Sequence, residues 1–225
     1  MSPTPGEPKR DLRSLTAAAE KRALLWLAAR TPPFISSDHL TLLGFAAMAG
    51  AGLSYWLSGT RPALLHVVNA CLALNWLGDS LDGTLARYRN RSRPRYGFYV
   101  DHMVDAFGAL FVLAGLAGSG LVSPGVAAGL LVAYLMLAVN MYLATCCLGV
   151  FKMSYAGMGG TEARLLLSLL NLALLRWPVI EAGAASYRLL DVVGVAAAAA
   201  MAVIVVIETA RNTATLSRAE PLPRG

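Results

Sequence analysis

The chain has 225 residues, of which 56% are hydrophobic and only 14% are charged. Soluble domains carry about a quarter of charged residues, so this composition excludes an ordinary soluble domain and is typical of a helical membrane protein. The formal net charge of +6 would suit a nucleic-acid binder, but its distribution along the chain argues against that class. The cysteines, Cys71, Cys146 and Cys147, lie in apolar segments without metal-ligand spacing and are expected to be small buried side chains.

Residues 1–37 precede the first long apolar stretch of the chain. Their start, residues 1–10, is polar and rich in proline, which predicts disorder. Residues 11–29 mix charged residues with leucine and alanine at helical spacing, which predicts an amphipathic juxtamembrane helix on the cytoplasmic membrane surface. The first membrane helix is then expected to begin with a cap from Ser36, Ser37 or Asp38.

Six apolar segments follow, each of a length that crosses the hydrocarbon core of a membrane as a helix. To within a few residues they cover 39–58, 63–86, 98–118, 122–150, 163–180 and 188–209. The sequence therefore predicts an all-α membrane protein with six transmembrane helices and an N-terminal surface helix. These helices are expected to form one transmembrane domain over residues 38–210, followed by a cytoplasmic tail over 211–225.

The basic residues gather on one side of this layout. With the N-terminus placed in the cytoplasm, sixteen of the 19 Lys and Arg residues lie inside, and Arg61, Arg176 and Arg188 lie at outer ends. This bias predicts that both termini are cytoplasmic. The positive charge is interpreted as a topology signal and an attraction for anionic membrane lipids, with no nucleic-acid partner.

Aspartates interrupt the apolar sequence near one end of two neighbouring helices. Asp79 and Asp82 are three residues apart, and Asp101 and Asp105 are four apart, so each pair lies on one helix face. The arginine-rich segment 87–95 joins the two helices on the cytoplasmic side. The two pairs are therefore expected to face each other at one depth.

Carboxylates at this spacing repel one another unless protons or cations neutralise them. Oxygen ligands suit hard divalent ions, and Mg²⁺ in particular is shared between a few carboxylates and substrate phosphates. Gly83 and Gly97 would let a ligand approach closely, and Arg87 lies where a guanidinium can fork onto a phosphate. Ionisable residues within membrane segments are usually functional, so a metal-dependent site for a phosphate-bearing substrate is predicted.

The same stretch resembles the signature of the CDP-alcohol phosphotransferases. All eight fixed positions are present, as Asp79-x2-Asp82-Gly83-x2-Ala86-Arg87-x9-Gly97-x3-Asp101-x3-Asp105. Members of that family make phospholipids by moving a phosphate-bearing group from a CDP-linked donor to an alcohol, with release of CMP. The six-span layout, the surface helix and the cytoplasmic motif are also similar to the family.

The resemblance implies a role for each matching position. The metal ligands would be Asp79, Asp82, Asp101 and Asp105, holding two ions of Mg²⁺ or Mn²⁺. The nucleotide would contact Asp82, Gly83, Ala86, Arg87 and Gly97. The resemblance also implies that Asp105 is the general base, whereas spacing alone does not choose between Asp101 and Asp105. It further implies a homodimer.

Other polar residues are candidates on position alone. Asn69, Asn75 and Asn140 lie within apolar segments and are expected to bond between helices or line a cavity. Asn75 is four residues before Asp79 and shares its face, so it is predicted to belong to the nucleotide pocket. Thr41 and Asp38, at the start of the first membrane helix, are predicted to border the same pocket.

The donor and acceptor stay open at this level. Bacterial members that resemble this chain mostly combine CDP-diacylglycerol with a polar alcohol. The pair Asp101-His102 instead resembles the choline and ethanolamine phosphotransferases, which combine a CDP-amino-alcohol with diacylglycerol. The acceptor-site candidates are His102, Lys152, Glu162 and Arg164. Glu162 would favour a cationic headgroup and the two basic residues an acceptor phosphate; all four also fit ordinary interfacial positions.

Two other classes of function fit the sequence less well. An ion-coupled transporter would spread its carboxylates across the membrane depth and repeat its helices in symmetric halves. Here the carboxylates cluster at one end of the helices. A non-catalytic scaffold would leave the motif unexplained, so an enzyme is expected.

Overall fold

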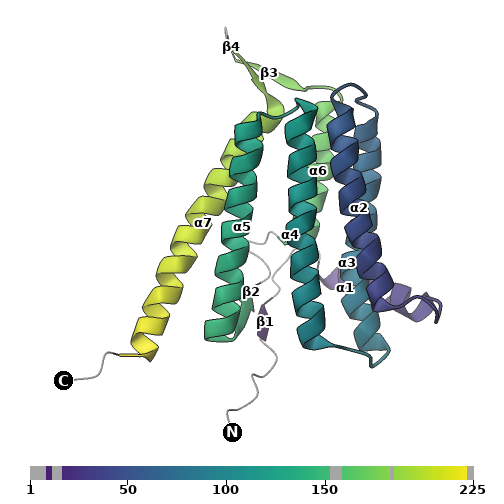
Figure 1. Cartoon of the computed structure of the whole chain (residues 1–225), viewed down its shortest axis with the longest axis vertical. Helices are drawn as coiled ribbons and strands as arrows, with labels where there is room; N and C mark the ends of the chain where they lie inside the picture. The colour runs from purple at the N-terminus through teal and green to yellow at the C-terminus, as the bar shows by residue number, and fades with distance from the viewer. Residues whose placement is uncertain (1–8, 12–16, 153–158, 183–184, 222–225) are drawn as a thin grey trace.

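The computed structural model of the chain describes residues 9–11, 17–152, 159–182 and 185–221 (Figure 1). Within these residues the chain is mostly helical. The helices are α1 Ala17–Arg30, α2 Ser37–Ser58, α3 Leu64–Tyr88, α4 Pro94–Ser119, α5 Pro124–Leu148, α6 Gly160–Leu174 and α7 Leu189–Ala219. The strands are β1 Lys9–Asp11, β2 Val150–Lys152, β3 Val179–Ala182 and β4 Ala185–Arg188. Strands β1 and β2 pair in parallel, and β3 and β4 form an antiparallel hairpin.

The helices begin and end where local chemistry favours it. Ser36 caps α2, since its hydroxyl accepts from the His39 N–H at 3.3 Å and His39 Nδ1 accepts from the Ser36 N–H at 3.2 Å. Of the capping residues that the sequence offered, Ser36 is therefore the one used. Gly120 and Gly149 cap the C-terminal ends of α4 and α5, with φ of 75° and 69°, the left-handed region that favours glycine.

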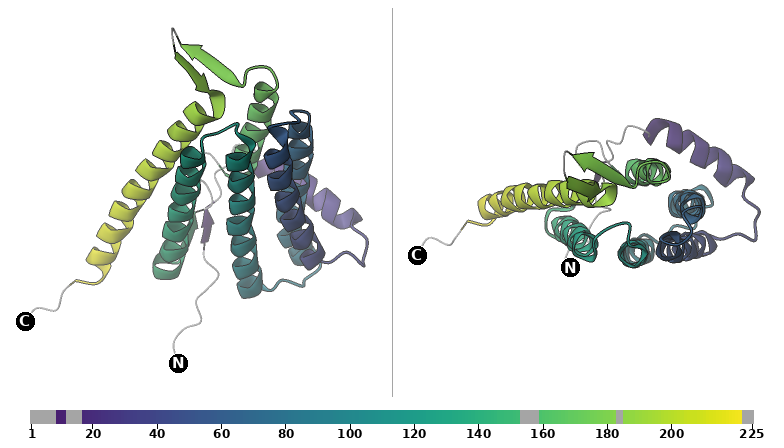
Figure 2. Two further views of the ribbon diagram at one scale, coloured as in Figure 1. Left: turned by 45° about the horizontal axis from the view of Figure 1, so that its top comes forward. Right: turned by 90° about the horizontal axis from the view of Figure 1, so that it is seen from above.

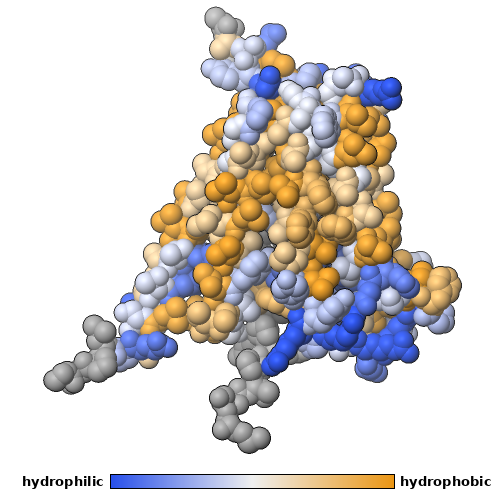
Figure 3. All heavy atoms as spheres, viewed as in Figure 1, coloured by the Kyte–Doolittle hydropathy of each residue, from blue (hydrophilic) through white to orange (hydrophobic). Residues whose placement is uncertain are grey.

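In the part of the chain that the structure describes, four helices are long and apolar enough to cross a membrane: α2, α4, α5 and α7. Helix α6 has only 15 residues, and α3 is interrupted by polar residues such as His66, Asn69 and Asn75. Figure 3 shows a hydrophobic band across the middle of the molecule, with hydrophilic residues gathered mainly at its lower end. This arrangement is that of a helical membrane protein.

Several predicted boundaries are wrong. The described residues include short strands, so the chain is not purely α-helical. Strand β1 pairs with β2, although disorder was expected for residues 1–10 and Asp11 was expected to begin the surface helix. Helix α6 ends at Leu174, short of the predicted 163–180, and a strand begins at Val179 after Pro178, which cannot continue a helix. Helix α7 continues to Ala219, so much of the predicted tail is helical. Residues 1–8, 12–16 and 153–158, within the predicted start, surface helix and polar link, lie outside the described residues.

Helix α2 packs against both α3 and α4, α3 also contacts α1 and α6, and α5 packs against α7 and α4 (Figures 1 and 2). One apolar core lies in the half of the bundle near the β3–β4 hairpin and includes Tyr55, Val68 and Val112. A second lies between α1, α2 and α3 and includes Leu24 and Leu85. These contacts hold the end of α3 that carries Asp79 and Asp82 firmly against α2.

Glycines allow α2 to approach both neighbours closely. A Cβ atom at Gly78 of α3 would lie 2.5 Å from the Leu40 carbonyl oxygen and 2.8 Å from the Gly44 nitrogen of α2. A Cβ atom at Gly115 of α4 would collide with the backbone of Gly52, again on α2. Small residues at helix contacts let backbones touch. Helix α2 is thus the common partner that brings α3 and α4 together.

Asparagines within the apolar helices bond between helices, as their positions predicted. Asn69 donates to the Ser168 carbonyl at 3.3 Å, and Asn140 donates to the Thr209 hydroxyl at 2.8 Å. Tyr55 joins the first of these networks by donating to Asn171 at 2.7 Å. Buried polar groups that are paired in this way hold neighbouring helices in one arrangement.

Candidate functional site

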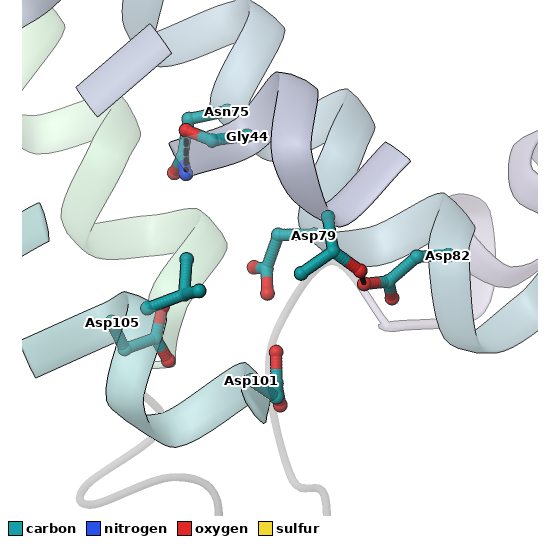
Figure 4. Close-up of a pocket in the computed structure, with 8 residues that line it drawn as sticks. Gly44, Asn75, Asp79, Asp82, Asp101 and Asp105 are labelled. Carbon is teal, nitrogen blue, oxygen red and sulfur yellow. Dashed lines mark hydrogen bonds between the residues drawn. The ribbon is translucent and has the colours of Figure 1, made fainter. Parts of the chain in front are cut away.

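The four aspartates line one pocket near the end of the bundle where α3 gives way to α4. Its other lining residues are Thr41, Gly44, Asn75 and Val104. Figure 4 shows Asp79 and Asp82 coming from α3, and Asp101 and Asp105 coming from α4. The two helix-face pairs therefore meet at one depth.

Three of the carboxylates form a tight group among the described residues. Asp79, Asp101 and Asp105 each present one carboxylate oxygen, and these oxygens all lie within 4.8 Å of one another. In Figure 4 the side chains of Asp79, Asp101 and Asp105 converge, whereas Asp82 lies to one side. An oxygen-only group of this kind has the chemistry that hard divalent cations prefer.

Asp82 is held by α2 and by its own backbone. The Thr41 hydroxyl donates to Asp82 Oδ2 at 2.6 Å, and the Gly83 N–H donates to Asp82 Oδ1. The Ser37 hydroxyl donates to the Asp82 carbonyl oxygen at 3.0 Å. Helix α2 therefore sets the orientation of this carboxylate, which the sequence alone did not reveal.

Arg164 of α6 reaches the acid group directly. Its Nη2 lies 2.6 Å from Asp79 Oδ2, and its Nε donates to Asn75 Oδ1 at 2.8 Å. Asn75 in turn donates to the Gly44 carbonyl at 3.1 Å. The predicted nucleotide residue Asn75 and the predicted acceptor residue Arg164 are thus joined in one network with Asp79.

The remaining motif residues lie in the last turns of α3 and the first turn of α4, next to the pocket. The Arg87 side chain folds back along α3, so that a Cβ atom at Gly83 would lie 3.3 Å from its Nη1, and its Nη2 donates to the Thr84 hydroxyl at 3.3 Å. Ala86 is half-buried on the same helix. Gly97 lies in the first turns of α4, where a Cβ atom would meet no described atom within 4 Å. Nothing in the described chain itself therefore requires glycine at position 97.

The other acceptor candidates have different surroundings. His102 does not line the pocket, because its ring stacks between Tyr142 and Phe151, with centroid distances of 4.8 Å and 5.2 Å. Its Nδ1 lies 3.5 Å from Asp101 Oδ2. Glu162 accepts from the Gly159 N–H at 3.0 Å and caps α6. Lys152 belongs to β2, and its side chain lies outside the described part of the structure.

Two arginines of the segment between α3 and α4 hold neighbouring parts of the chain. Arg89 donates to the carbonyl oxygens of Ile35, Thr31 and Pro32, at 2.5 Å, 2.7 Å and 2.9 Å, and so ties α3 to the link before α2. Arg93 pairs with Asp38, and this hydrogen bond raises the pKa of the exposed guanidinium above its usual value. These arginines therefore do more than set topology.

Glu20 of α1 is a further residue that the sequence did not single out. Its Oε1 accepts from Trp76 Nε1 at 2.9 Å, from the Ser80 hydroxyl at 3.0 Å and from the Thr161 hydroxyl at 3.0 Å. One carboxylate oxygen thus joins α1 to α3 and α6 beside Asp79. No local pattern distinguishes Glu20 from an ordinary charge on a surface helix, so only its tertiary contacts identify it.

Neither a scan against models of protein families nor a search of curated proteins gives a match for this chain. The fold and the site together define a mostly helical membrane protein with an acidic pocket at one end of its bundle. Four carboxylates line that pocket, and Arg164 pairs with one of them, Asp79.

Proposed function

We propose that this chain is a phospholipid-synthesis enzyme of the CDP-alcohol phosphotransferase type. It transfers a substituted phosphate group from a CDP-linked donor, CDP-diacylglycerol, to the hydroxyl of an alcohol acceptor and releases CMP. The observation that carries this proposal is the convergence on one pocket of all four carboxylates of the motif. A chain selected only for membrane packing has no reason to bury carboxylates opposite one another.

The residues present fit a hard divalent cation. Asp79, Asp101 and Asp105 supply an oxygen-only donor group, and Asp82 lies beside them with its orientation set by Thr41. We assign Mg²⁺ or Mn²⁺, two ions, to these four carboxylates. When bound, the ions would neutralise charge on the donor diphosphate and on the departing CMP.

The reaction needs a base for the acceptor hydroxyl, and the proposal assigns that role to Asp105. As its carboxylate takes the hydroxyl proton, the acceptor oxygen forms a bond to the donor phosphorus that bears the lipid. The bond from that phosphorus to the CMP oxygen breaks, and CMP leaves with the electron pair. Arg87, exposed at the end of α3, is suited to hold a donor phosphate by forked hydrogen bonds.

The proposed setting is the cytoplasmic face of a bacterial inner membrane. In it, α2 to α7 all cross the bilayer, α1 lies on the cytoplasmic surface, and two copies form a homodimer. The diacylglycerol chains of the donor would then remain in the bilayer while its diphosphate reaches the pocket. The acceptor would enter from the cytoplasm.

The test is CMP release by the purified full chain in lipid nanodiscs with Mg²⁺ or Mn²⁺. One panel combines CDP-diacylglycerol with glycerol phosphate, serine or inositol phosphate. A second combines CDP-choline or CDP-ethanolamine with diacylglycerol. We expect CMP from the first panel; CMP from the second panel alone would assign the amino-alcohol reaction instead. No CMP from any pair would contradict the proposal.

The variant Asp105→Asn tests the proposed general base, and Asp191→Asn is its matched control. We expect CMP release to fall by about 10²–10⁴-fold, the range for loss of a general base, while binding of a CDP-linked donor persists. Asp191→Asn makes the same change at the opposite end of the bundle, where Asp191 accepts from the Ser123 hydroxyl at 2.7 Å, and should leave turnover unchanged. Loss of donor binding in Asp105→Asn would show that Asp105 is chiefly a metal ligand.

A further inference from the structure

The contact between Arg164 and Asp79 places a fixed positive charge on one member of the acid group. Arg164 Nη2 and Asp79 Oδ2 are 2.6 Å apart, and the two side chains are only 18% and 25% exposed. The second hydrogen bond, from Arg164 Nε to Asn75 at 2.8 Å, fixes the plane of the guanidinium. Arg164 is therefore held in place by two partners on α3.

The start of α6 is built to present this arginine. Arg164 folds back over Gly160, one turn earlier, where a Cβ atom would lie 3.3 Å from its Nη1. Thr161 donates to Glu20 at 3.0 Å, and Glu162 caps the helix by accepting from the Gly159 N–H at 3.0 Å. The helix end is thus anchored to α1 while the arginine extends toward α3.

The segment Gly-Thr-Glu-Ala-Arg at 160–164 repeats a pattern found at the end of α3. There the segment Gly-Thr-Leu-Ala-Arg at 83–87 places Arg87 over Gly83, also with a Cβ-to-Nη1 distance of 3.3 Å. Both arginines lie four residues after a glycine, which leaves room for the guanidinium to fold back along its helix. Arg164 Nη2 lies 2.6 Å from Asp79 Oδ2, and Arg87 Nη2 donates to the Thr84 hydroxyl at 3.3 Å.

Asp79 is at the same time one of the three carboxylates whose oxygens lie within 4.8 Å of one another. A divalent cation bound there would lie beside the guanidinium, and two positive charges at that separation repel each other. The hydrogen-bonded Oδ2 of Asp79 would also be partly withdrawn from the cation. The guanidinium and the cation therefore compete for Asp79.

We infer that Arg164 is a built-in counter-ion of the acid group, which a divalent cation must displace from Asp79 when it binds. In this role Arg164 is a positioning residue. It reduces repulsion among Asp79, Asp101 and Asp105 before the cation arrives, and it sets the cation concentration that the site requires. The inference rests on the proposed function, since it concerns the same metal site.

The test measures Mn²⁺ binding to the full chain in nanodiscs, without substrate, by electron paramagnetic resonance of free Mn²⁺. We expect Arg164→Gln to bind Mn²⁺ about tenfold more tightly than the wild type, because a hydrogen bond to a charged group no longer has to be broken. Arg164→Lys keeps the charge but loses the fork, so we expect an increase of about threefold. Arg176→Gln removes an exposed arginine just beyond the C-terminal end of α6 and should leave Mn²⁺ binding unchanged.

A second readout is thermal unfolding with and without Mn²⁺. Without the cation, Arg164→Gln should unfold at a lower temperature than the wild type, and Mn²⁺ should stabilise it more than it stabilises the wild type. Unchanged or weaker Mn²⁺ binding in Arg164→Gln would overturn the inference; if that variant does not fold, the same result in Arg164→Lys would do so. If the wild type binds Mn²⁺ and neither Arg164 variant binds it more tightly, only this inference is contradicted. If no form of the protein binds Mn²⁺, the proposed metal site is contradicted as well.

Discussion

The Asp82 carboxylate accepts hydrogen bonds from the Thr41 hydroxyl, at 2.6 Å, and from the adjacent Gly83 N–H. Asp79 is instead paired with Arg164 at 2.6 Å. Acids that look equivalent in the motif therefore have different partners. These partners determine how readily each carboxylate can turn toward a ligand.

Thr41→Val removes the hydroxyl that orients Asp82 and keeps the shape of the side chain. A hydrogen bond to a charged group contributes about 1.5–3 kcal/mol, so we expect kcat/KM for CMP release to fall by roughly tenfold or more. Steady-state CMP assays over a range of donor and Mg²⁺ concentrations would measure this. Thr60→Val, just beyond the C-terminal end of α2, is the control, because the Thr60 hydroxyl donates only to the Leu57 carbonyl at 3.1 Å among the contacts described. Equal kcat/KM in both variants would mean that Asp82 needs no such support.

The surroundings of His102 are set by aromatic residues that are distant in sequence. The sequence allowed an acceptor-site or an interfacial role. In the structure its ring is stacked between Tyr142 and Phe151, with interplanar angles of 14° and 26°. The His102 Nδ1 atom lies 3.5 Å from Oδ2 of Asp101, which lines the pocket.

Among the helices, α2 determines the geometry of the pocket although it contributes none of the four acids. Its Gly44 lies against Gly78 of α3, and its Gly52 lies against Gly115 of α4. These contacts fix the separation of α3 and α4, and with it the distance between the two aspartate pairs. The apolar sequence of α2 alone does not reveal this function.

Gly78→Ala tests the close contact between α2 and α3. Its Cβ would lie 2.5 Å from a backbone oxygen, which cannot move as a flexible side chain would. Overpacking of this kind costs about 1–3 kcal/mol, so we expect a lower temperature of thermal unfolding and weaker Mn²⁺ binding. Gly129→Ala in α5 is the matched control, since a Cβ there meets no described atom within 4 Å. A Gly78→Ala protein as stable as Gly129→Ala would contradict the proposed contact.

Across the whole molecule, the connection between α3 and α4 and the β3–β4 hairpin lie at opposite ends of the bundle (Figure 1). The ends of α3 and α4 that carry the aspartates lie at the same end as the arginines Arg89, Arg91, Arg93 and Arg95. Positive residues stay on the cytoplasmic side during insertion. The proposed orientation of the chain in the membrane follows from this distribution.

Single cysteines test that orientation in intact cells. In a background with Cys71, Cys146 and Cys147 replaced by serine, Ser186→Cys lies in the exposed strand β4 and Ser92→Cys in the exposed segment before α4. We expect a membrane-impermeant maleimide to label Ser186→Cys in intact cells and Ser92→Cys only after permeabilisation. Labelling of Ser92→Cys in intact cells would reverse the proposed orientation.

Local patterns in the sequence were sufficient to predict a mostly helical membrane protein and to place each pair of aspartates on one helix face; they predicted six membrane helices, whereas four of the described helices are long and apolar enough to cross a membrane. Long apolar runs predicted the helices, because a helix buries its backbone polar groups within a single segment. Spacings of three and four residues placed each aspartate pair on one face. Helix ends were less predictable: α6 stops at Leu174 and α7 runs to Ala219, since neighbouring packing and turns decide where a helix ends.

The partners of the acids were decided by tertiary structure. Arg164 and Asp79 are 85 residues apart in sequence, and Glu20 and Thr161 are 141 apart, so no local spacing reports that they meet. Such contacts depend on how closely the helices approach, and that distance is set by glycines facing other backbones. The sequence alone therefore determined that acids would gather at one end of a membrane bundle. Packing decided which arginine pairs with Asp79 and which threonine donates to Asp82, because helices must touch before their side chains can pair.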